Sequence, residues 1–232
     1  MTVELKKRII TSILLFSLVI FCIFINWPIY ILSIIIVSGI VFSEIVNLIR
    51  LVEKSTSTKN WIPFGLISFF YIFFLFLPMA GSFYTLGPVF IIYILLICIF
   101  SDIGGYIIGK TIGGKKLTKI SPNKTISGSI GSFCFSIVPL LLFYNFDQSK
   151  YFYSFNNFLF CLEISLVCQL GDIFISYIKR KAKVKNTGTL LPGHGGLLDR
   201  IDGIIFALPF AWIHMNSLNA YFEIMKSAFS RL

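Results

Sequence analysis

The run NNFLFCLEISLVCQLGDIFISYI, residues 156–178, is long and apolar enough to cross a lipid bilayer. A spanning helix needs about 20 mostly apolar residues, and this run consists largely of Leu, Ile, Phe, Val and Cys. At about 100° per residue, Ser165, Gln169, Asp172, Ser176 and Lys179 fall on one face of such a helix. The pattern predicts a transmembrane helix whose single polar stripe serves a site.

Similar apolar runs continue through the chain. They lie at 9–26, 28–49, 62–80, 88–109, 128–146 and 202–216. The sequence Asn26-Trp27-Pro28 ends the first run, because Pro cannot continue a helix and restricts the residue before it. Of the 232 residues, 56% are hydrophobic and 13% charged, whereas a soluble domain is about a quarter charged. We therefore expect an all-α, polytopic integral membrane helix bundle with about 7 transmembrane helices (range 7–9). We expect the first run to be retained rather than cleaved, because no signal-peptidase pattern follows it.

The basic residues are sorted between these runs. Of the 20 Lys and Arg, 17 fall at the N-terminus, after the second run and in the polar stretches 110–127 and 179–201. By the positive-inside rule, these segments face the cytoplasm. The net charge of +10 therefore indicates orientation in a bilayer, and we expect no nucleic-acid partner.

Carboxylates inside apolar runs are informative because each costs about 2.5–3.5 kcal/mol to insert at a helix centre. Glu44, Asp102, Glu163 and Asp172 lie in or at the ends of such runs. Asp172 lies toward one end of the polar stripe, which leads on to the basic Lys179-Arg180 pair and suits an anionic ligand held at a metal. The alternative is a buried polar seam that only joins helices.

The stretch LPGHGGLLDRIDG, residues 191–203, combines glycines with charged residues. Glycines on both sides of His194 let the backbone turn sharply and approach a ligand. Asp199 and Asp202, three residues apart, share one side of a helix that begins nearby. Arg200 can bind phosphate oxygens in a fork, and carboxylates are the usual protein ligands of Mg²⁺. We interpret His194 as a residue that handles substrate, with a structural role as the alternative.

The stretch GGYIIGKT, residues 104–111, matches the P-loop pattern in letters only. A P-loop requires a preceding strand and a following helix, whereas a spanning segment precedes this one. We expect no P-loop here. Lys110, Lys115 and Lys116 either flank a membrane helix or attract nucleotide and anionic head groups.

Residues 176–202 closely resemble the signature of the phosphatidate cytidylyltransferase (CDP-diacylglycerol synthase) family in the order and spacing of their Ser, Lys, Arg, Gly and Asp residues. Residues 169–172 (QLGD), 120–125 (ISPNKT) and Asp102 with its neighbours also resemble family blocks, so the resemblance covers about 98–210. It departs at Asn186 and Ser127, where the family usually has carboxylates.

The resemblance implies a reaction in which CTP and phosphatidate give CDP-diacylglycerol and pyrophosphate. It also implies Mg²⁺ held by Asp172 and Asp199, with a second cation left open, and a homodimer in the bilayer. Expected catalytic residues are Asp172, Asp199, Lys179, Arg180, His194 and Arg200. Expected substrate-binding residues are Asp102, Ser121, Lys124, Thr125, Ser176, Lys185, Gly195, Gly196 and Asp202.

In this interpretation residues 1–90 are N-terminal transmembrane helices and 91–232 form the catalytic transmembrane domain. The expected location is the inner (cytoplasmic) membrane, with the active site facing the cytoplasm.

One alternative is a related CTP-dependent lipid kinase or cytidylyltransferase that acts on a prenol or ether lipid. A second is a cation-coupled transporter with an intramembrane cation site. The Lys/Arg residues near the surface and the His-Gly-Gly cluster favour the enzyme.

Overall fold

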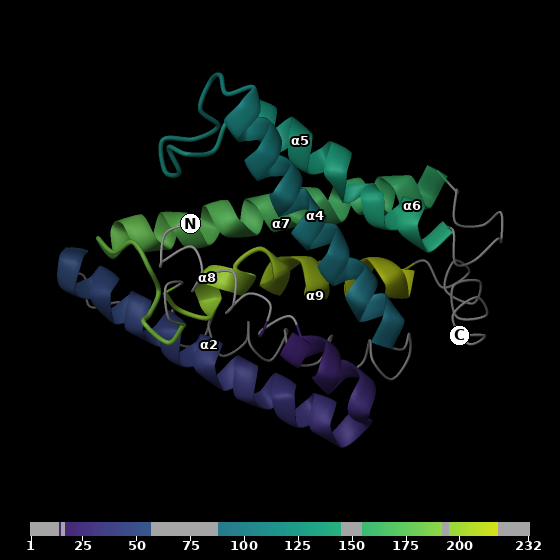
Figure 1. Cartoon of the computed structure of the whole chain (residues 1–232). Helices are drawn as coiled ribbons and strands as arrows, with labels where there is room; N and C mark the ends of the chain where they lie inside the picture. Colours follow the sequence, from purple (N-terminus) through teal and green to yellow (C-terminus); the bar gives the residue numbers. More distant parts are fainter. Residues whose placement is uncertain (1–13, 15–16, 57–87, 145–154, 192–194, 218–232) are drawn as a thin grey trace. The chain divides into compact units, whose positions relative to one another are not determined.

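The computed structural model describes residues 14, 17–56, 88–144, 155–191 and 195–217, and these are helical apart from short loops (Figure 1). The chain divides into two compact units, each described here by itself. One comprises residues 1–80 and 177–202, and the other comprises 81–176 and 203–232. We call them the N-terminal unit and the central unit. Residues 177–202 group with residues 1–80 in this division, and the expected functional division at residue 90 stays a prediction.

The main element of the N-terminal unit is α2 (Trp27–Thr56). A helical stretch, residues 17–25, precedes it and ends at Asn26, as the Asn-Trp-Pro sequence predicts. The Asn26 side chain accepts a hydrogen bond from the Ile29 amide at 3.1 Å and so caps α2. The buried side chains of α2 recur every three or four residues and form one stripe: Tyr30, Ile34, Ser38, Val41, Glu44 and Leu48. The unit also contains α8 (Leu198–Ile201), which contacts α2.

The central unit contains α4 (Pro88–Thr111), α5 (Ile126–Ser136), α6 (Val138–Tyr144), α9 (Ile204–Ser217) and most of α7 (Phe155–Lys181). Its core consists of large apolar side chains from α4, α7 and α9, with Tyr93, Ile97 and Ile164 fully buried. α7 continues beyond this core, so its last residues, from Tyr177, belong to the N-terminal unit.

Glycines bring α4 and α5 into close contact. A Cβ added at Gly104 would lie 2.5 Å from the Gly131 carbonyl oxygen, and one at Gly109 would lie 3.3 Å from the Gly128 Cα. Small residues at such positions allow two membrane helices to pack backbone against backbone. The glycines of the P-loop-like stretch therefore lie within a helix and serve helix packing, as expected of a chance match.

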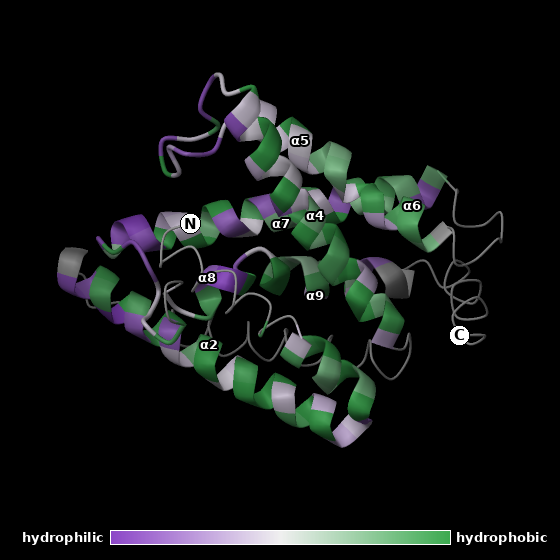
Figure 2. Ribbon diagram, in the orientation of Figure 1, coloured by the Kyte–Doolittle hydropathy of each residue, from purple (hydrophilic) through white to green (hydrophobic). Residues whose placement is uncertain are grey.

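Four of the described helices are long and apolar enough to cross a membrane: Trp27–Lys54, Pro88–Thr111, Ile126–Phe143 and Phe155–Lys181. Apolar residues cover most of these helices, and polar ones gather in the α4–α5 loop and at the C-terminal end of α7 (Figure 2). The chain is thus a multi-pass membrane helix bundle, as predicted. The expected run 62–80 lies outside the described residues, as does part of 9–26.

Two of the expected spans differ in detail from a single straight helix. The expected run 128–146 begins as α5 and continues as α6, with a break at Ile137. Pro139 explains the break, because its ring would collide with the carbonyl of residue 135 in a continuous helix. The last apolar run forms α9, which has 14 residues and contains Pro209. It is shorter than the roughly 20 residues that a straight span requires.

Candidate active site

The polar stripe predicted on α7 is present. The Gln169 side-chain amide donates to the Ser165 hydroxyl at 3.2 Å, and the Ser176 hydroxyl donates to Asp172 at 3.3 Å. Ser129 of α5 donates to Gln169 at 2.6 Å, and Ser101 of α4 lies 2.8 Å from Ser165, oxygen to oxygen. The buried end of the stripe therefore joins three helices, which is the seam that the sequence left open as an alternative.

Asp172 has a different environment, because it forms an ion pair with Lys124. The two side chains are 27% and 28% exposed, so the pair is accessible rather than sealed in the core. Asp102 of α4 lies within electrostatic reach of both groups. The sequence predicted all three as site residues, and the fold brings them together from α4, the α4–α5 loop and α7.

This cluster fits a divalent cation that is also held by substrate. Two carboxylates against one ammonium leave a net negative charge, which a cation neutralises. Among the described residues, no group of three or more His, Cys, Asp or Glu is arranged to hold a metal. Mg²⁺ suits a site with few protein ligands, because it usually keeps several waters and binds one or two carboxylates plus substrate phosphates.

Lys124 is positioned by a tightly folded loop between α4 and α5. The Leu117 amide donates to the Lys124 carbonyl at 2.8 Å, and the Lys124 amide donates to the Ser121 carbonyl at 3.1 Å. Thr125 then caps α5 by accepting from the Gly128 amide at 3.1 Å. Ser121 and Thr125, predicted to contact substrate, thus shape the backbone on either side of Lys124.

Asp199 lies in a second cluster, within the N-terminal unit. Its Oδ1 accepts from the Lys179 ammonium at 2.7 Å, and its Oδ2 accepts from the amides of Thr187 and Gly196 at 2.7 and 3.0 Å. Lys179 was expected on the polar stripe of α7, and its ammonium pairs with Asp199. Both partners are nearly buried, at 12% and 8% exposure.

Gly195 and Gly196, which follow His194 in the sequence, leave space for two carboxylates of the protein itself. Gly195 adopts φ of +90°, and a Cβ there would lie 2.7 Å from Asp199 Oδ2. A Cβ on Gly196 would lie 2.4 Å from an oxygen of Glu44. The Gly195 amide donates to the Leu191 carbonyl at 3.2 Å and the Gly196 amide donates to Asp199. Both amides predicted for substrate are therefore engaged within the loop.

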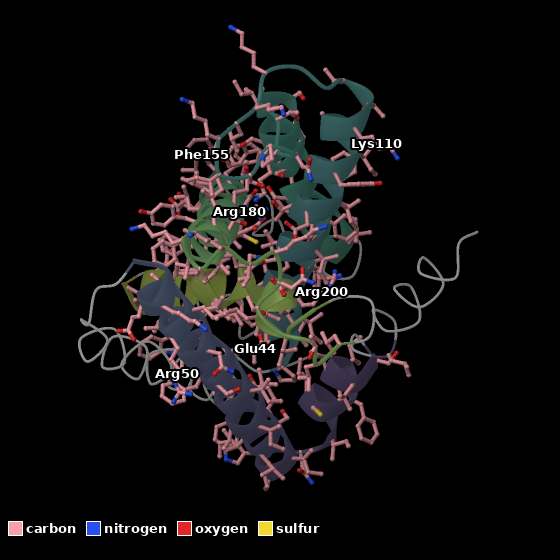
Figure 3. All side chains as sticks on the ribbon, turned by 90° about the vertical axis from the view of Figure 1, so that its left-hand side faces the viewer. Glu44, Arg50, Lys110, Phe155, Arg180 and Arg200 are labelled. Carbon is pink, nitrogen blue, oxygen red and sulfur yellow. The ribbon has the colours of Figure 1, made fainter. Side chains whose placement is uncertain are left out.

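Glu44 is the residue that sequence reasoning missed. It lies on α2 (labelled in Figure 3), is 6% exposed, and accepts hydrogen bonds from the Leu197 and Leu198 amides, each at 2.9 Å. The Thr187 hydroxyl donates to it at 2.8 Å. Its position in the middle of an apolar run was a readable signal, but nothing local identified its partners.

The other predicted residues lie outside these two clusters of hydrogen bonds. Arg180, Lys185 and Arg200 are exposed, and Asp202 follows α8 in helical backbone geometry. His194 lies outside the described residues. On the far face of α7, Glu163 lies 3.2 Å from His214 Nδ1, so the two groups left out of the site pair with each other.

The helices and clusters define a class of protein: a multi-pass membrane protein with acidic and basic side chains at the ends of its spans. The sequence profile of the Cytidylyltransferase family matches residues 50–218, and the chain belongs to this family.

Three bacterial relatives are phosphatidate cytidylyltransferases. The protein of Staphylococcus aureus (strain COL) is 45% identical over 128 residues, 53% of this chain and 47% of that protein. The Bacillus subtilis protein is 39% identical over 127 residues, 54% and 47% of the two chains. The Helicobacter pylori protein is 34% identical over 152 residues, 65% and 54%. The chain spans about half the length of the curated relatives it matches.

Proposed function

We propose that this protein transfers CMP from CTP to phosphatidate, giving CDP-diacylglycerol and pyrophosphate. The family membership supports the nucleotide chemistry, and the names of the relatives support the lipid acceptor. The observation that carries the proposal is the accessible cluster of Asp172, Lys124 and Asp102 at one end of the polar stripe on α7. A lipid with its tails in the bilayer can present its phosphate to such a cluster.

The reaction proceeds without a covalent enzyme intermediate. A phosphate oxygen of phosphatidate forms a bond to the α-phosphorus of CTP. The bond from that phosphorus to the oxygen bridging to the β-phosphorus breaks, and pyrophosphate leaves with the electron pair. The attacking phosphate is already an anion, so no strong base is needed. The barrier comes from bringing anions together and from charge on the leaving group.

The protein's residues answer these two difficulties. Lys124 offers a fixed positive charge to a phosphate when Asp172 binds a cation in place of the lysine. Lys179 supplies positive charge beside Asp199, and the exposed Arg180 and Arg200 can bind phosphate oxygens in a fork. A bound Mg²⁺ would neutralise phosphate oxygens and the charge that develops on pyrophosphate.

Asp172 and Asp199 are the proposed ligands of Mg²⁺, and their surroundings indicate which of the two has oxygens more accessible to a cation. Asp172 is about a quarter exposed and has one side-chain hydrogen bond besides its ion pair, so its oxygens are accessible to a cation. Asp199 Oδ2 already accepts from Thr187 and Gly196, and only Oδ1, paired with Lys179, has capacity left. We propose Asp172 as the stronger ligand, and the assignment of Asp199 rests on the family resemblance.

Location and assembly are further parts of the proposal. The basic loops 110–127 and 179–201 support a site that faces the cytoplasm from the inner membrane. His194 is retained as a residue that handles substrate, because it lies in the second of these loops. A homodimer follows from the family resemblance, as does the assignment of catalysis to residues 91–232.

The test is incubation of purified protein with CTP, phosphatidate and Mg²⁺, followed by analysis of the lipid product. CDP-diacylglycerol and one equivalent of pyrophosphate are expected. Asp172→Asn should abolish the product and leave the protein folded in detergent. The matched control is Glu163→Gln on the opposite face of α7, which should retain most activity. CDP-lipid formed only from an ether lipid, or phosphorylation of a prenol, would overturn the choice of substrate.

A further inference from the structure

We propose that Glu44, on the N-terminal helix α2, is a positioning residue that fixes Asp199 through the loop after α7. The inference rests on the proposed function for its kinetic consequence, and on the contacts of the N-terminal unit for its geometry. It assigns a role in the reaction to the part of the chain that resembled the family only in being hydrophobic.

The first support is the number and kind of groups that Glu44 binds. Oε1 accepts from the Leu197 amide, and Oε2 accepts from the Leu198 amide and the Thr187 hydroxyl. All three bonds are 2.8–2.9 Å long and buried. A buried carboxylate is costly unless its oxygens accept hydrogen bonds. Here every donor comes from residues 187–198, the loop after α7 together with the first residue of α8. The carboxylate therefore holds the loop in one arrangement.

The second support is that the same loop residues hold Asp199. Thr187 donates its amide to Asp199 Oδ2 at 2.7 Å, and its hydroxyl lies 3.1 Å from the same oxygen. A hydroxyl has one proton, so Thr187 can donate to Glu44 or to Asp199 at one time. When it donates to Glu44, its amide still binds Asp199. Thr187 thus links the two carboxylates.

The third support is the space that glycines leave for Glu44. A Cβ at Gly188 would lie 3.1 Å from Glu44 Oε1, and one at Gly196 would lie 2.4 Å from Oε2. Any other residue at 196 would displace the carboxylate or the loop. Gly196 is therefore required by Glu44, whereas Gly195 is required by the turn at φ +90°.

Substitution by Gln is the sharpest perturbation, because it preserves size while changing the hydrogen-bonding pattern. A Gln side chain has one acceptor oxygen, and its NH₂ group would face at least one backbone N–H, which can only donate. At least one of the three bonds is then lost. Outer-shell partners of metal ligands typically change activity by about 10- to 100-fold, so we expect kcat to fall by that factor. KM for phosphatidate should stay at the parent value, because Glu44 contacts the loop rather than substrate.

The experiment compares Glu44→Gln with two matched controls in the full-length protein in detergent. Glu53→Gln makes the same change nine residues later on α2, and should leave kcat unchanged. Thr187→Ser retains the hydroxyl and should retain activity, whereas Thr187→Val removes it and should lose activity like Glu44→Gln. Hydrogen exchange followed by mass spectrometry should be faster at residues 195–198 in Glu44→Gln, with α4 unchanged.

The outcomes separate this inference from the proposed function. If the parent protein makes no CDP-diacylglycerol, the proposed function fails, and hydrogen exchange still tests whether Glu44 holds the loop. If the parent is active and Glu44→Gln retains both kcat and slow exchange, the inference is overturned. A loss of kcat that only tracks a loss of folded protein would also overturn it. Should Glu44→Gln fail to fold, the contrast between Thr187→Ser and Thr187→Val decides.

Discussion

Replacement of Gly131 by Ala tests the contact between α4 and α5. Its Cβ would lie 2.5 Å from the Ile108 Cβ and 2.7 Å from the Gly104 carbonyl oxygen. Both atoms are attached rigidly to α4, so relief requires the two helices to separate. The same substitution at Gly39 of α2 meets no atom within 4 Å. The two variants make the same chemical change in a membrane helix, one with steric conflict and one without.

The expected magnitudes follow from two opposing effects. Ala is favoured over Gly in a helix interior by about 1 kcal/mol, so Gly39→Ala should stabilise by up to that amount. Overpacking costs about 1–3 kcal/mol, and the backbone contact at Gly131 places this site toward the upper end. After the helix gain is subtracted, Gly131→Ala should destabilise by about 1–2 kcal/mol. That corresponds to a change of roughly 5- to 30-fold in the unfolding equilibrium.

The assay is unfolding in mixed micelles at rising mole fractions of SDS, followed by circular dichroism. Cytidylyl transfer should fall with stability in Gly131→Ala, because the loop carrying Lys124 leads directly into α5. The reasoning would be refuted if Gly131→Ala proved as stable as Gly39→Ala, since a close backbone contact cannot accept an added methyl group without cost.

Three further expectations address the ion pair, a helix end and the topology. Lys124→Gln should lower cytidylyl transfer, because the fixed positive charge beside Asp172 is removed; unchanged transfer would contradict this role. Lys183→Gly should stabilise the protein by about 1 kcal/mol in the SDS titration, because Lys183 lies just after α7 in the left-handed region at φ 57°. An unchanged midpoint would contradict this. Cysteines placed at Lys116 and Lys183 should react with impermeant thiol reagents only after lysis; labelling in intact cells would reverse the orientation.

Much of the bundle could be predicted because membrane helices are encoded locally. Apolar length predicted the helices beginning near Trp27, Pro88 and Phe155, and the Asn-Trp-Pro sequence predicted the start of α2. The break between α5 and α6 was missed although Pro139 marks it. Average hydropathy over 128–146 does not register a single proline that lacks an amide donor.

The site was predictable only where helix geometry determines it. The spacing of Gln169, Asp172 and Ser176 placed them on one face of α7, and their hydrogen bonds confirm it. The same spacing placed Lys179 on this face but did not give its partner, Asp199. Periodicity gives the face on which a side chain lies, whereas a lysine has a long and flexible stem, and its partner depends on how the following loop returns. The path of that loop is not encoded in the sequence of the helix.

The carboxylates show where local signals end. Glu44 and Asp172 stood out for the same reason, since each is an acid in an apolar run. One is accessible beside Lys124, and the other is buried under three donors from a loop more than 140 residues away. No sequence pattern separates these cases, because each is an acid among apolar residues and the partners that distinguish them come from elsewhere in the chain. The glycines at 195 and 196 carried the missing information: a backbone without Cβ atoms indicates a close approach, and the groups that approach are Asp199 and Glu44. Glycine-rich loops in membrane enzymes should therefore be examined for internal carboxylates before a ligand is assigned to them.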